Sequence, residues 1–362
     1  MNILIAAGGT GGHITPGIAI ANRLKQEGNK ILFVGTTSGM EVDLIPKAGY
    51  EIKYIHAKGL HRGLSFKNLE SISELFKGIS EVKKIIKEEK IDLVIGTGGY
   101  VTAPAMIAAL NCKIPTLIHE SNALPGKTTI WLSSRVDRVA VGFNETLNRL
   151  PKAKCAVYTG NPTKLTDNFS KEITRKKLGI EKPLVLVFGG SQGAKKLNDT
   201  MIELINTAKI EEYQIIYATG PKHYDEIISK INASNKNLEN GNVKIEKYIY
   251  NMEEIMVASD LAVCRSGALT VTELGIVGLP AILIPFPYAA ENHQYYNAKT
   301  IADSGAGIII EEKNLNSGAL KSKIEEILFD KQKIQEMRQN AKKDEMKNAM
   351  ENIVREINEI TK

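Results

Sequence analysis

Two glycine-rich loops in the sequence each follow a short apolar run that opens one half of the chain. Gly8-Gly-Thr-Gly-Gly-His13 follows Ile3–Ala6, and Gly189-Gly-Ser-Gln-Gly-Ala194 follows Leu184–Phe188. A loop that leaves the carboxyl end of a buried parallel strand needs residues that tolerate positive φ. The helix that follows directs its free N–H groups at whatever binds there. Two such elements predict two similar Rossmann-like domains.

Short apolar runs alternate with longer amphipathic segments along the whole chain. The runs are nearly continuous, as in strands that are buried on both faces of a parallel sheet. This rhythm predicts an α/β fold with two doubly wound parallel sheets. We expect strands at Ile3–Ala6, Ile31–Gly35, Asp92–Gly96, Thr116–His119, Arg138–Gly142, Leu184–Phe188, Gln214–Ala218, Val243–Lys247, Leu261–Cys264 and Ala281–Ile284.

The length of 362 residues also favours two domains, because single cores rarely exceed about 250–300 residues. A linker is expected near Gly160–Asp167. We therefore predict one domain over residues 1–162 and a second over residues 163–340. A polar helical segment, 341–362, is expected to pack back on the first domain.

The charge balance is mildly basic, with 47 Lys and Arg against 41 Asp and Glu. It suits anionic ligands or an anionic membrane surface, and no dense basic block suggests nucleic acid. The three cysteines, Cys112, Cys155 and Cys264, show no C-x-x-C spacing, which indicates reduced thiols and a cytoplasmic protein. The N-terminus lacks the pattern of a signal peptide. No apolar run approaches the ~18–20 residues that span a bilayer, so any membrane contact should be peripheral.

The glycine loops favour an anionic ligand, although such loops also serve merely to connect a strand to a helix. Neither matches G-x-x-x-x-G-K-[ST], so a P-loop NTPase is not predicted. His13 ends the first loop where a helix begins. Its imidazole is a candidate general base; the alternative is a histidine that only bonds nearby backbone.

The stretch from Cys264 to Glu273 reads as a strand end followed by a helix start. Ser266-Gly267 is a suitable N-cap pair, the helix start suits a diphosphate, and Glu273 suits the two hydroxyls of a ribose. The alternative is a capped helix with a surface Glu. A further loop is expected over Glu291–Ala298, with amides that suit sugar hydroxyls, unless it is only a polar surface loop. Glu120 and Asn122 follow another strand and either face a cleft or are buried polar residues.

The sequence contains no D-x-D motif and no H-x-x-x-H spacing. We therefore predict no metal site and no cofactor. A leaving diphosphate must then be neutralised by helix starts, hydroxyls and basic side chains.

Taken together, these motifs resemble the MurG family of peptidoglycan glycosyltransferases, in order and over nearly the whole chain. The matching segments are Gly8–His13, His119–Asn122, Gly160–Pro162, Gly189–Gly193, Arg265–Glu273 and Asn292–Gln294. The resemblance implies a GT-B fold, with two Rossmann-like domains and a deep cleft between them. It also implies an inverting, metal-independent transfer of N-acetylglucosamine from UDP-N-acetylglucosamine to undecaprenyl-linked lipid I in cell-wall synthesis, which serves cell shape and division.

The resemblance carries roles for individual residues. His13 is the first choice for general base and Glu120 the second. Substrate-binding roles fall on Thr10, Gly11, Gly12, Asn122, Lys164, Ser191, Ile249, Arg265, Ala268, Leu269, Thr270, Glu273 and Gln294. Two positions depart from the family: Lys164 stands where Arg is frequent and lacks its bidentate fork, and Ser121 stands where Gln is frequent.

The segment Leu64–Ile86 mixes apolar and basic side chains. Its apolar residues are Phe66, Leu69, Ile72, Leu75, Phe76 and Ile79, interspersed with Lys67, Lys77, Lys83 and Lys84. Such a mixture is typical of an interfacial patch but also of a core-facing helix with a solvated lysine face. Because the family associates with the cytoplasmic face of the cell membrane, we expect peripheral binding to an anionic membrane surface.

Two other functions fit part of the pattern. A second GT-B enzyme, such as a diacylglycerol glycosyltransferase or a UDP-sugar 2-epimerase, would share the fold and donor site. A non-enzymatic nucleotide-sugar-binding subunit would need a catalytic partner. The motifs Gly8–His13 and His119–Asn122 favour the muramoyl acceptor, and the presence of both sets of motifs on one chain favours a complete enzyme.

Overall fold

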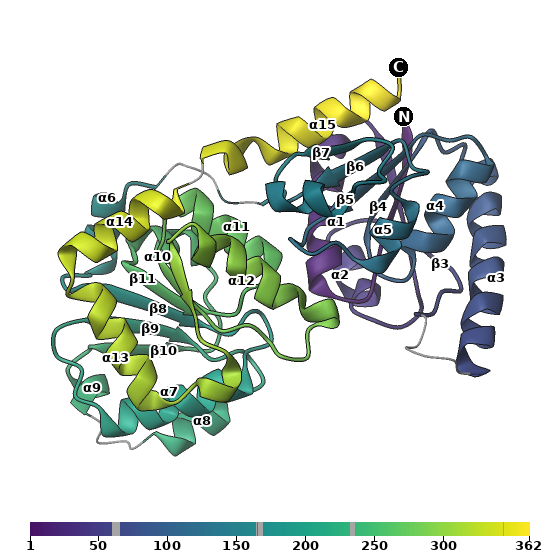
Figure 1. The fold of residues 1–362 in the computed structure, drawn as a ribbon. Coiled ribbons are helices and arrows are strands. Elements are labelled where there is room, and N and C mark those ends of the chain that lie inside the picture. The colour runs from purple at the N-terminus through teal and green to yellow at the C-terminus, as the bar shows by residue number, and fades with distance from the viewer. Residues whose placement is uncertain (60–65, 164, 166–168, 232–235, 343) are drawn as a thin grey trace. The chain divides into compact units, whose positions relative to one another are not determined.

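The structure is a computed structural model that describes residues 1–59, 66–163, 165, 169–231, 236–342 and 344–362. The chain divides into two compact units, here called unit 1 and unit 2 (Figure 1). Unit 1 comprises Met1–Lys164 with Glu345–Lys362, and unit 2 comprises Leu165–Asp344. Within the described part of the chain, no helix combines the length and apolar character needed to span a membrane.

Unit 1 is built on a seven-stranded sheet in the order β3-β2-β1-β4-β5-β6-β7. All neighbouring strands are parallel. The side chains of the central strands β1 and β4 are buried almost throughout, as their apolar sequences require. The strands are β1 (Asn2–Ala7), β2 (Lys30–Gly35), β3 (Ile52–Tyr54), β4 (Leu93–Gly98), β5 (Thr116–Glu120), β6 (Arg138–Val141) and β7 (Ala156–Tyr158).

Helices cover both faces of this sheet. The chain moves one way along the sheet from β1 to β3 and the opposite way after β3. Because crossovers are right-handed, the helices of these two stretches lie on opposite faces. One apolar cluster joins the sheet to α1, α2 and α15, and another joins it to α3, α4 and α5. A short 3-10 helix, η1, precedes β7. The bounds are α1 (Gly11–Gln26), α2 (Glu41–Lys47), α3 (Phe66–Glu88), α4 (Thr102–Asn111), α5 (Lys127–Leu132), η1 (Asn144–Arg149) and α15 (Ala349–Ile360).

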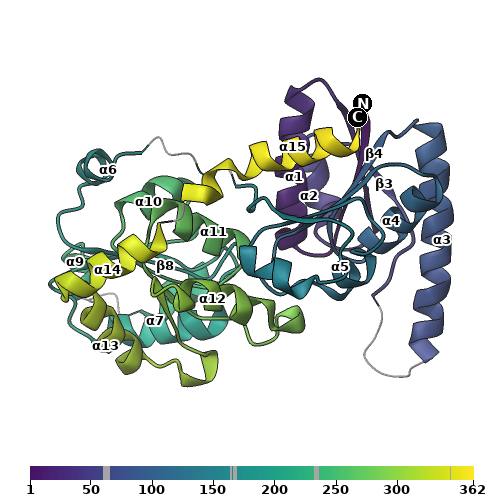
Figure 2. The same ribbon diagram turned by 45° about the horizontal axis from the view of Figure 1, so that its top comes forward.

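The last helix, α15, returns the end of the chain to unit 1 (Figure 2). Ile353, Val354 and Ile357 enter the same apolar cluster as α1 and the strands. Arg138 at the start of β6 donates to Glu356 at 2.8 Å and to Glu359 at 2.7 Å. The amphipathic sequence of this segment is thus matched by an apolar face on the core and a charged rim.

Unit 2 is built on a six-stranded parallel sheet in the order β10-β9-β8-β11-β12-β13. This order repeats that of the first six strands of unit 1, counted along each half of the chain. It is the order of a Rossmann domain. The strands are β8 (Leu184–Phe188), β9 (Gln214–Ala218), β10 (Val243–Glu246), β11 (Leu261–Cys264), β12 (Ala281–Leu283) and β13 (Gly307–Ile309).

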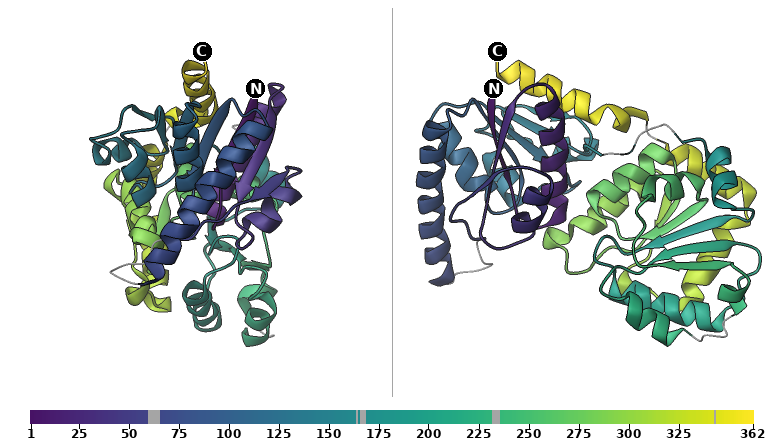
Figure 3. Two further views of the ribbon diagram at one scale, coloured as in Figure 1. Left: turned by 90° about the vertical axis from the view of Figure 1, so that its right-hand side faces the viewer. Right: turned by 180° about the vertical axis from the view of Figure 1, so that it is seen from behind.

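Helices lie on both faces of this second sheet (Figure 3). The main apolar cluster joins the strands to α7, α8, α13 and α14 on one face. Helix α11 connects β11 to β12, helix α12 connects β12 to β13, and the two helices pack on each other. The bounds are α6 (Lys171–Leu178), α7 (Lys195–Thr207), α8 (Tyr224–Lys230), α9 (Lys236–Glu239), α10 (Met252–Ala258), α11 (Ala268–Val277), η2 (Ala290–Asn292), α12 (His293–Asp303), η3 (Glu312–Asn314), α13 (Ser317–Leu328) and α14 (Lys331–Ala341). The short 3-10 helix η4 (Asp344–Asn348) begins at the last residue of unit 2 and continues in unit 1.

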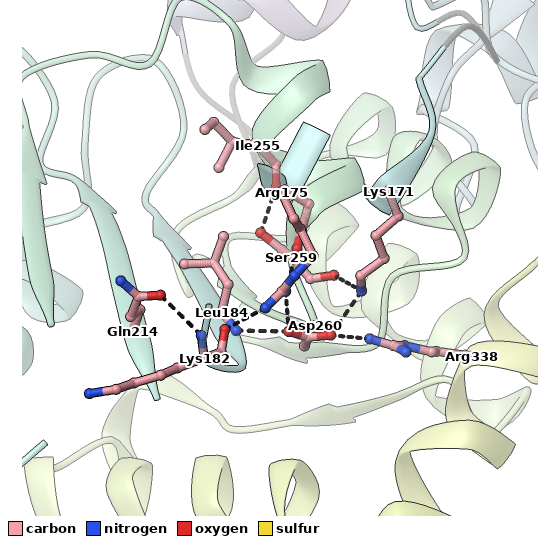
Figure 4. Close-up of polar contacts among 10 residues, drawn as sticks. Lys171, Arg175, Lys182, Leu184, Gln214, Ile255, Ser259, Asp260 and Arg338 are labelled. Carbon is pink, nitrogen blue, oxygen red and sulfur yellow. Dashed lines mark hydrogen bonds and ion pairs between the residues drawn. The ribbon is translucent and has the colours of Figure 1, made fainter. Parts of the chain in front are cut away.

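One partly buried carboxylate binds several segments together at the amino end of the unit 2 strands (Figure 4). Asp260 accepts from the Leu184 N–H at 2.8 Å, from Lys171 at 2.8 Å and from Arg175 at 2.9 Å, and it also pairs with Arg338. Burial alone would raise the pKa of Asp260, but these cations and the Leu184 N–H hold it below its usual range. The cluster fastens α6 and α14 to β8 and β11.

The predicted α/β fold with two parallel-sheet domains is confirmed, and all ten predicted strands are present with bounds within two residues. Three strands were not predicted, namely β3, β7 and β13. Each has three residues and lies at the edge of its sheet. A strand this short and only partly buried displays no continuous apolar run, so its sequence carries no strand signal.

Candidate active site

The first glycine loop joins β1 to α1 and shapes the surroundings of His13. Gly9 has φ +87°, which a side chain would oppose. Thr10 is the N-cap of α1, without a side-chain cap. The Nδ1 atom of His13 lies 3.2 Å from the Gly8 carbonyl and 3.5 Å from the Thr10 hydroxyl. His13 therefore bonds the local backbone, as one interpretation expected, and its ring is held in a defined orientation.

A second glycine pair in unit 1 was not singled out from the sequence. Gly98 ends β4, Gly99 follows it, and the two have φ +119° and +81°. A Cβ on Gly99 would lie 2.2 Å from the Gly8 carbonyl oxygen, and one on Gly98 would lie 2.4 Å from Cδ2 of His13. The two loops therefore pack directly on each other. The signal was available, since two glycines directly after a buried strand mark a close backbone approach.

Glu120 ends β5 and is buried, with its carboxylate occupied by neighbouring donors. It accepts from the Asn122 N–H at 3.0 Å, the Asn122 amide at 3.3 Å, the Gly126 N–H at 2.9 Å and the Thr129 hydroxyl at 2.7 Å. A substrate hydroxyl would have to compete with these four bonds. The geometry thus suits Glu120 to holding Asn122 and its loop in place.

The His119–Asn122 and Gly160–Pro162 segments meet inside unit 1. The Nε2 atom of His119 lies 3.3 Å from the Gly160 carbonyl, and the Asn161 amide donates to the Ser121 carbonyl at 3.1 Å. His119 is fully buried, and burial lowers its pKa. Ser121, the departure from the family pattern, is also buried. These residues join two neighbouring loops, while Lys164 lies outside the described residues.

The glycine loop of unit 2 joins β8 to α7. Gly190 and Gly193 have φ +85° and +78°. A Cβ on Gly193 would lie 2.3 Å from the Thr219 carbonyl oxygen, so the loop rests on the end of β9. Ser191 is exposed at the tip of the loop. No side chain caps α7, which leaves its positive end available to an anion.

Helix α11 begins at Ala268, and its N-cap is Gly267. Of the predicted N-cap pair Ser266-Gly267, Gly267 is therefore the N-cap, whereas the Ser266 hydroxyl donates to the Gln294 carbonyl at 2.8 Å. No side chain caps α11. The first turn, Ala268–Thr270, therefore presents backbone N–H groups, as a diphosphate site requires. Glu273 lies in the second turn and is partly exposed.

Arg265 precedes this helix and is buried. Its guanidinium donates to the carbonyls of Ile284 and Pro285, each at 3.1 Å, and forms an ion pair with Glu312. It also lies 5.3 Å from the centre of the Phe286 ring. Arg265 therefore fixes the loop after β12, and Glu312 offsets its charge. Neither Glu312 nor the loop contact was predicted.

The predicted loop over Glu291–Ala298 is wrong for most of its length, since α12 begins at His293. The helix follows two non-glycine residues with positive φ, Glu291 and Asn292. Gln294 lies in its first turn and accepts from the Phe286 N–H at 2.9 Å. Ile249 is buried just after β10. Arg265 and Gln294 thus both bond the backbone directly after β12.

The segment predicted as a membrane patch divides between core and surface. On α3, Ile79 is buried in the apolar cluster of unit 1, whereas Ile72 and Phe76 are exposed, Phe76 by 67%. Ile130 and Trp131 on α5 are also exposed. Leu64 lies outside the described residues, as do the side chains of Phe66, Lys67 and Leu69. Helices α3 and α5 cover the same face of the sheet.

Among the residues that the structure describes, no three His, Cys, Asp or Glu side chains form a group that could hold a metal ion.

Models of a known family match both halves of the chain. The Glycosyltransferase family 28 N-terminal domain matches residues 3–141, and the Glycosyltransferase family 28 C-terminal domain matches residues 184–353. The first match lies within unit 1, and the second covers most of unit 2 and extends into the start of α15. The two family matches, together with the two α/β units, therefore define the class as a two-domain glycosyltransferase.

Curated relatives and a solved structure agree with this class. Proteins named UDP-N-acetylglucosamine–N-acetylmuramyl-(pentapeptide) pyrophosphoryl-undecaprenol N-acetylglucosamine transferase are similar to the chain. The one from Acetivibrio thermocellus is 46% identical, covering 100% of this chain and 99% of its own length. That from Caldanaerobacter subterraneus is 44% identical, covering 94% and 95%. The crystal structure of Acinetobacter baumannii MurG has a TM-score of 0.81 at 28% identity and covers 99% of each chain. The chain belongs to glycosyltransferase family 28 and, within it, to the MurG group.

Proposed function

We propose that this chain transfers N-acetylglucosamine from UDP-N-acetylglucosamine to undecaprenyl-pyrophosphoryl-N-acetylmuramoyl-pentapeptide, converting lipid I to lipid II in peptidoglycan synthesis. The observation that carries the proposal is the full-length match to relatives named for this reaction. The motifs of both units support it, because the donor and acceptor roles each have residues on this one chain.

Unit 2 binds the donor in this proposal. The first turn of α11 and the start of α7 with Ser191 hold the diphosphate, because both helix starts lack a side-chain cap. Glu273 takes the ribose hydroxyls, Ile249 backs the uracil, and Gln294 contacts the sugar. The remaining donor contacts are assigned to Arg265, Ala268, Leu269, Thr270 and Lys164.

Arg265 acts mainly by shaping the donor site. Its guanidinium holds the carbonyls of Ile284 and Pro285, and Glu312 offsets its charge. The N-termini of α7 and α11 therefore provide most of the stabilisation of the diphosphate charge, because their helix dipoles favour a negative group.

Unit 1 provides the acceptor side. The C4 hydroxyl of the muramoyl group attacks the anomeric carbon of the α-linked donor from the opposite side, and one displacement gives the β-1,4 bond. His13 takes the hydroxyl proton as general base. The UDP oxygen leaves with the electron pair of the broken bond. Thr10, Gly11, Gly12 and Asn122 contact the transferred sugar, and Glu120 keeps Asn122 in position.

The lipid acceptor requires contact with the cytoplasmic face of the cell membrane. Exposed apolar side chains on α3 and α5, together with exposed lysines of α3 such as Lys77 and Lys84, supply a peripheral attachment. We expect the wild-type protein to sediment with anionic vesicles, and a smaller fraction of Phe76→Ser or Trp131→Ser to do so. Tyr250→Ser removes an exposed aromatic ring from unit 2 and serves as the control. Equal sedimentation of all four proteins would refute this attachment.

The function itself is tested by incubating purified protein with labelled UDP-N-acetylglucosamine and a lipid I analogue in the presence of EDTA. We expect label in the disaccharide product, with β stereochemistry. Absence of product under these conditions, and its appearance only with added Mg²⁺ or Mn²⁺, would contradict the metal-independent mechanism. Transfer to diacylglycerol in place of the lipid I analogue would contradict the acceptor.

A further inference from the structure

Glu41 begins α2 and buries a carboxylate beside the first glycine loop. Only 1% of the residue is exposed. Its Oε2 accepts from the Gly9 N–H at 2.9 Å, and its Oε1 accepts from the Thr36 N–H at 3.2 Å and the Thr36 hydroxyl at 2.7 Å. Burying a carboxylate is costly unless donors of this kind compensate it. The loop is therefore built around this group.

Three glycines make the space that the carboxylate occupies. A Cβ on Gly39 would lie 2.5 Å from Oε2 of Glu41, one on Gly35 would lie 2.9 Å from Cγ, and one on Gly8 would lie 3.0 Å from Oε1. These glycines come from three different segments: the end of β1, the end of β2 and the turn before α2. Their convergence indicates that the position of Glu41 is defined by the carboxyl ends of β1 and β2 and by the turn before α2.

The N–H that Glu41 binds belongs to the same peptide group as the carbonyl that binds His13. The peptide joining Gly8 to Gly9 donates its N–H to Glu41, and its carbonyl oxygen lies 3.2 Å from Nδ1 of His13. A carboxylate on the N–H of an amide polarises it and strengthens its carbonyl as an acceptor. Because a carbonyl oxygen only accepts, Nδ1 carries the hydrogen and Nε2 keeps the lone pair.

The His13 ring is also held by the second glycine loop. The Thr97 hydroxyl donates to the His13 carbonyl at 2.8 Å. Gly98 lies against the ring, since a Cβ there would approach Cδ2 to 2.4 Å. Lys58 and Tyr100 are further titratable groups in this region, where they line a cavity of about 410 Å³ together with Glu41.

We propose that Glu41 is a positioning residue for the reaction, acting on His13 through the Gly8–Gly9 peptide. It fixes the Nδ1–H tautomer and stabilises the imidazolium that forms when Nε2 accepts a proton. This inference rests on the proposed function, in which that proton comes from the acceptor hydroxyl. Glu41 acts through its hydrogen bonds to the Gly9 N–H and Thr36 and takes no part in the proton transfer. A carboxylate orients a catalytic histidine by direct contact in Ser-His-Asp triads, whereas here one peptide group lies between them.

The test compares two charge-removing variants in the same helix. Glu41→Gln keeps an oxygen for the Gly9 N–H but removes the charge, and Asp43→Asn removes an exposed charge in the same first turn. Each protein is labelled with ¹⁵N-histidine and titrated by NMR. The His13 signals are assigned by their loss in His13→Gln.

In the wild-type protein we expect the Nδ1–H tautomer of His13 above its titration midpoint. Glu41→Gln should lower that midpoint by about one pH unit, because the imidazolium loses a favourable charge. It should lower kcat by about 10- to 100-fold and leave the KM for UDP-N-acetylglucosamine unchanged. Asp43→Asn should match the wild type in all three measurements.

An Nε2–H tautomer in the wild-type protein overturns the proposal, and this measurement needs no variant to fold. A His13 titration that Glu41→Gln leaves unchanged also overturns it. If His13→Gln retains full turnover while Glu41→Gln still shifts the His13 titration, the base assignment in the proposed function fails and the coupling of Glu41 to His13 stands.

Discussion

The carboxyl edges of the two sheets bury charges of opposite sign. In unit 1, Glu41 and Glu120 accept hydrogen bonds from loop N–H groups. In unit 2, Arg265 donates to loop carbonyls. The two sheets share the order of their first six strands, so topology does not set this difference. It comes from single side chains placed on equivalent scaffolds.

This difference bears on which ligand each edge accepts. In unit 1 the Gly9 N–H, which a phosphate would otherwise use, is already bound by Glu41. In unit 2 no side chain caps α7 or α11, and the buried Arg265 is paired with Glu312. Unit 2 therefore suits the diphosphate of the donor, and the glycine loop of unit 1 suits an uncharged hydroxyl near His13.

The sharpest test of this comparison is His13→Gln. We expect kcat to fall by about 10²- to 10⁴-fold, as for the loss of a general base, with UDP affinity unchanged because the donor contacts lie in unit 2. Steady-state kinetics and calorimetric titration with UDP measure the two quantities. His56→Gln, which alters an exposed histidine paired with Glu81, is the control. Unchanged turnover in His13→Gln would remove the catalytic role from unit 1's loop.

A second test separates the two ends of the unit 2 sheet. Asp260→Asn should reduce the free energy of unfolding by about 3–5 kcal/mol, because three cations lose their shared partner (Figure 4). UDP affinity of the folded protein should stay unchanged, since the carboxyl edge is intact. Urea unfolding measures the stability, and Asp199→Asn, which breaks an exposed pair with Lys195, is the control.

The same residue predicts a pH dependence. The pKa of Asp260 is held below its usual range in the folded protein. A depressed folded-state pKa contributes stability above the unfolded-state value, and this contribution is lost as pH falls through the folded-state pKa. The free energy of unfolding of the wild type should therefore fall more steeply on acidification than that of Asp260→Asn, as urea unfolding at a series of pH values measures. Parallel curves would show that the ion cluster does not contribute.

A third test concerns Glu120, which with Glu41 is one of the two buried carboxylates of unit 1 named above. Glu120→Gln should cost about 1–3 kcal/mol of stability, because a buried donor loses its acceptor. Its effect on kcat should be smaller than that of His13→Gln. Thermal unfolding and steady-state kinetics measure both. A kcat loss equal to that of His13→Gln, in a protein of unchanged stability, would favour Glu120 as the base.

The smallest expected effect concerns the donor loop. Ser191→Ala should raise the KM for UDP-N-acetylglucosamine by about 2- to 10-fold, as for one hydrogen bond worth about 0.5–1.5 kcal/mol. Gln192→Ala, an exposed neighbour in the same loop, should have no effect. If both variants behave alike, the loop does not contact the diphosphate through Ser191.

The sequence was sufficient for the central strands of both sheets, because strands buried on both faces show as continuous apolar runs. It was insufficient for β3, β7 and β13, whose three residues at a sheet edge form no such run. The start of α12 was also missed, since Glu291 and Asn292 hold positive φ directly before it. A run of polar residues after a strand favours a loop prediction, and the sequence does not show that the chain turns into a helix after two residues with positive φ.

Site residues divide in the same way. His13 and Ser191 stand in motifs that mark strand-to-helix loops, so their location could be predicted. Glu41 could not, because its partner Gly9 is 32 residues away and only the packed sheet edge brings them together. Likewise, Glu312 pairs with Arg265 across 47 residues. Long-range ion pairs of this kind leave no local pattern.

The return of α15 to unit 1 has a consequence for synthesis on the ribosome. Ile353, Val354 and Ile357 fill part of the core formed by the first strands of the chain. Unit 1 therefore lacks part of its interior until the final residues emerge, after all of unit 2 has been translated. Until α15 is made, the part of this apolar cluster that Ile353, Val354 and Ile357 cover stays exposed, although α1 and α2 already pack on the rest of it.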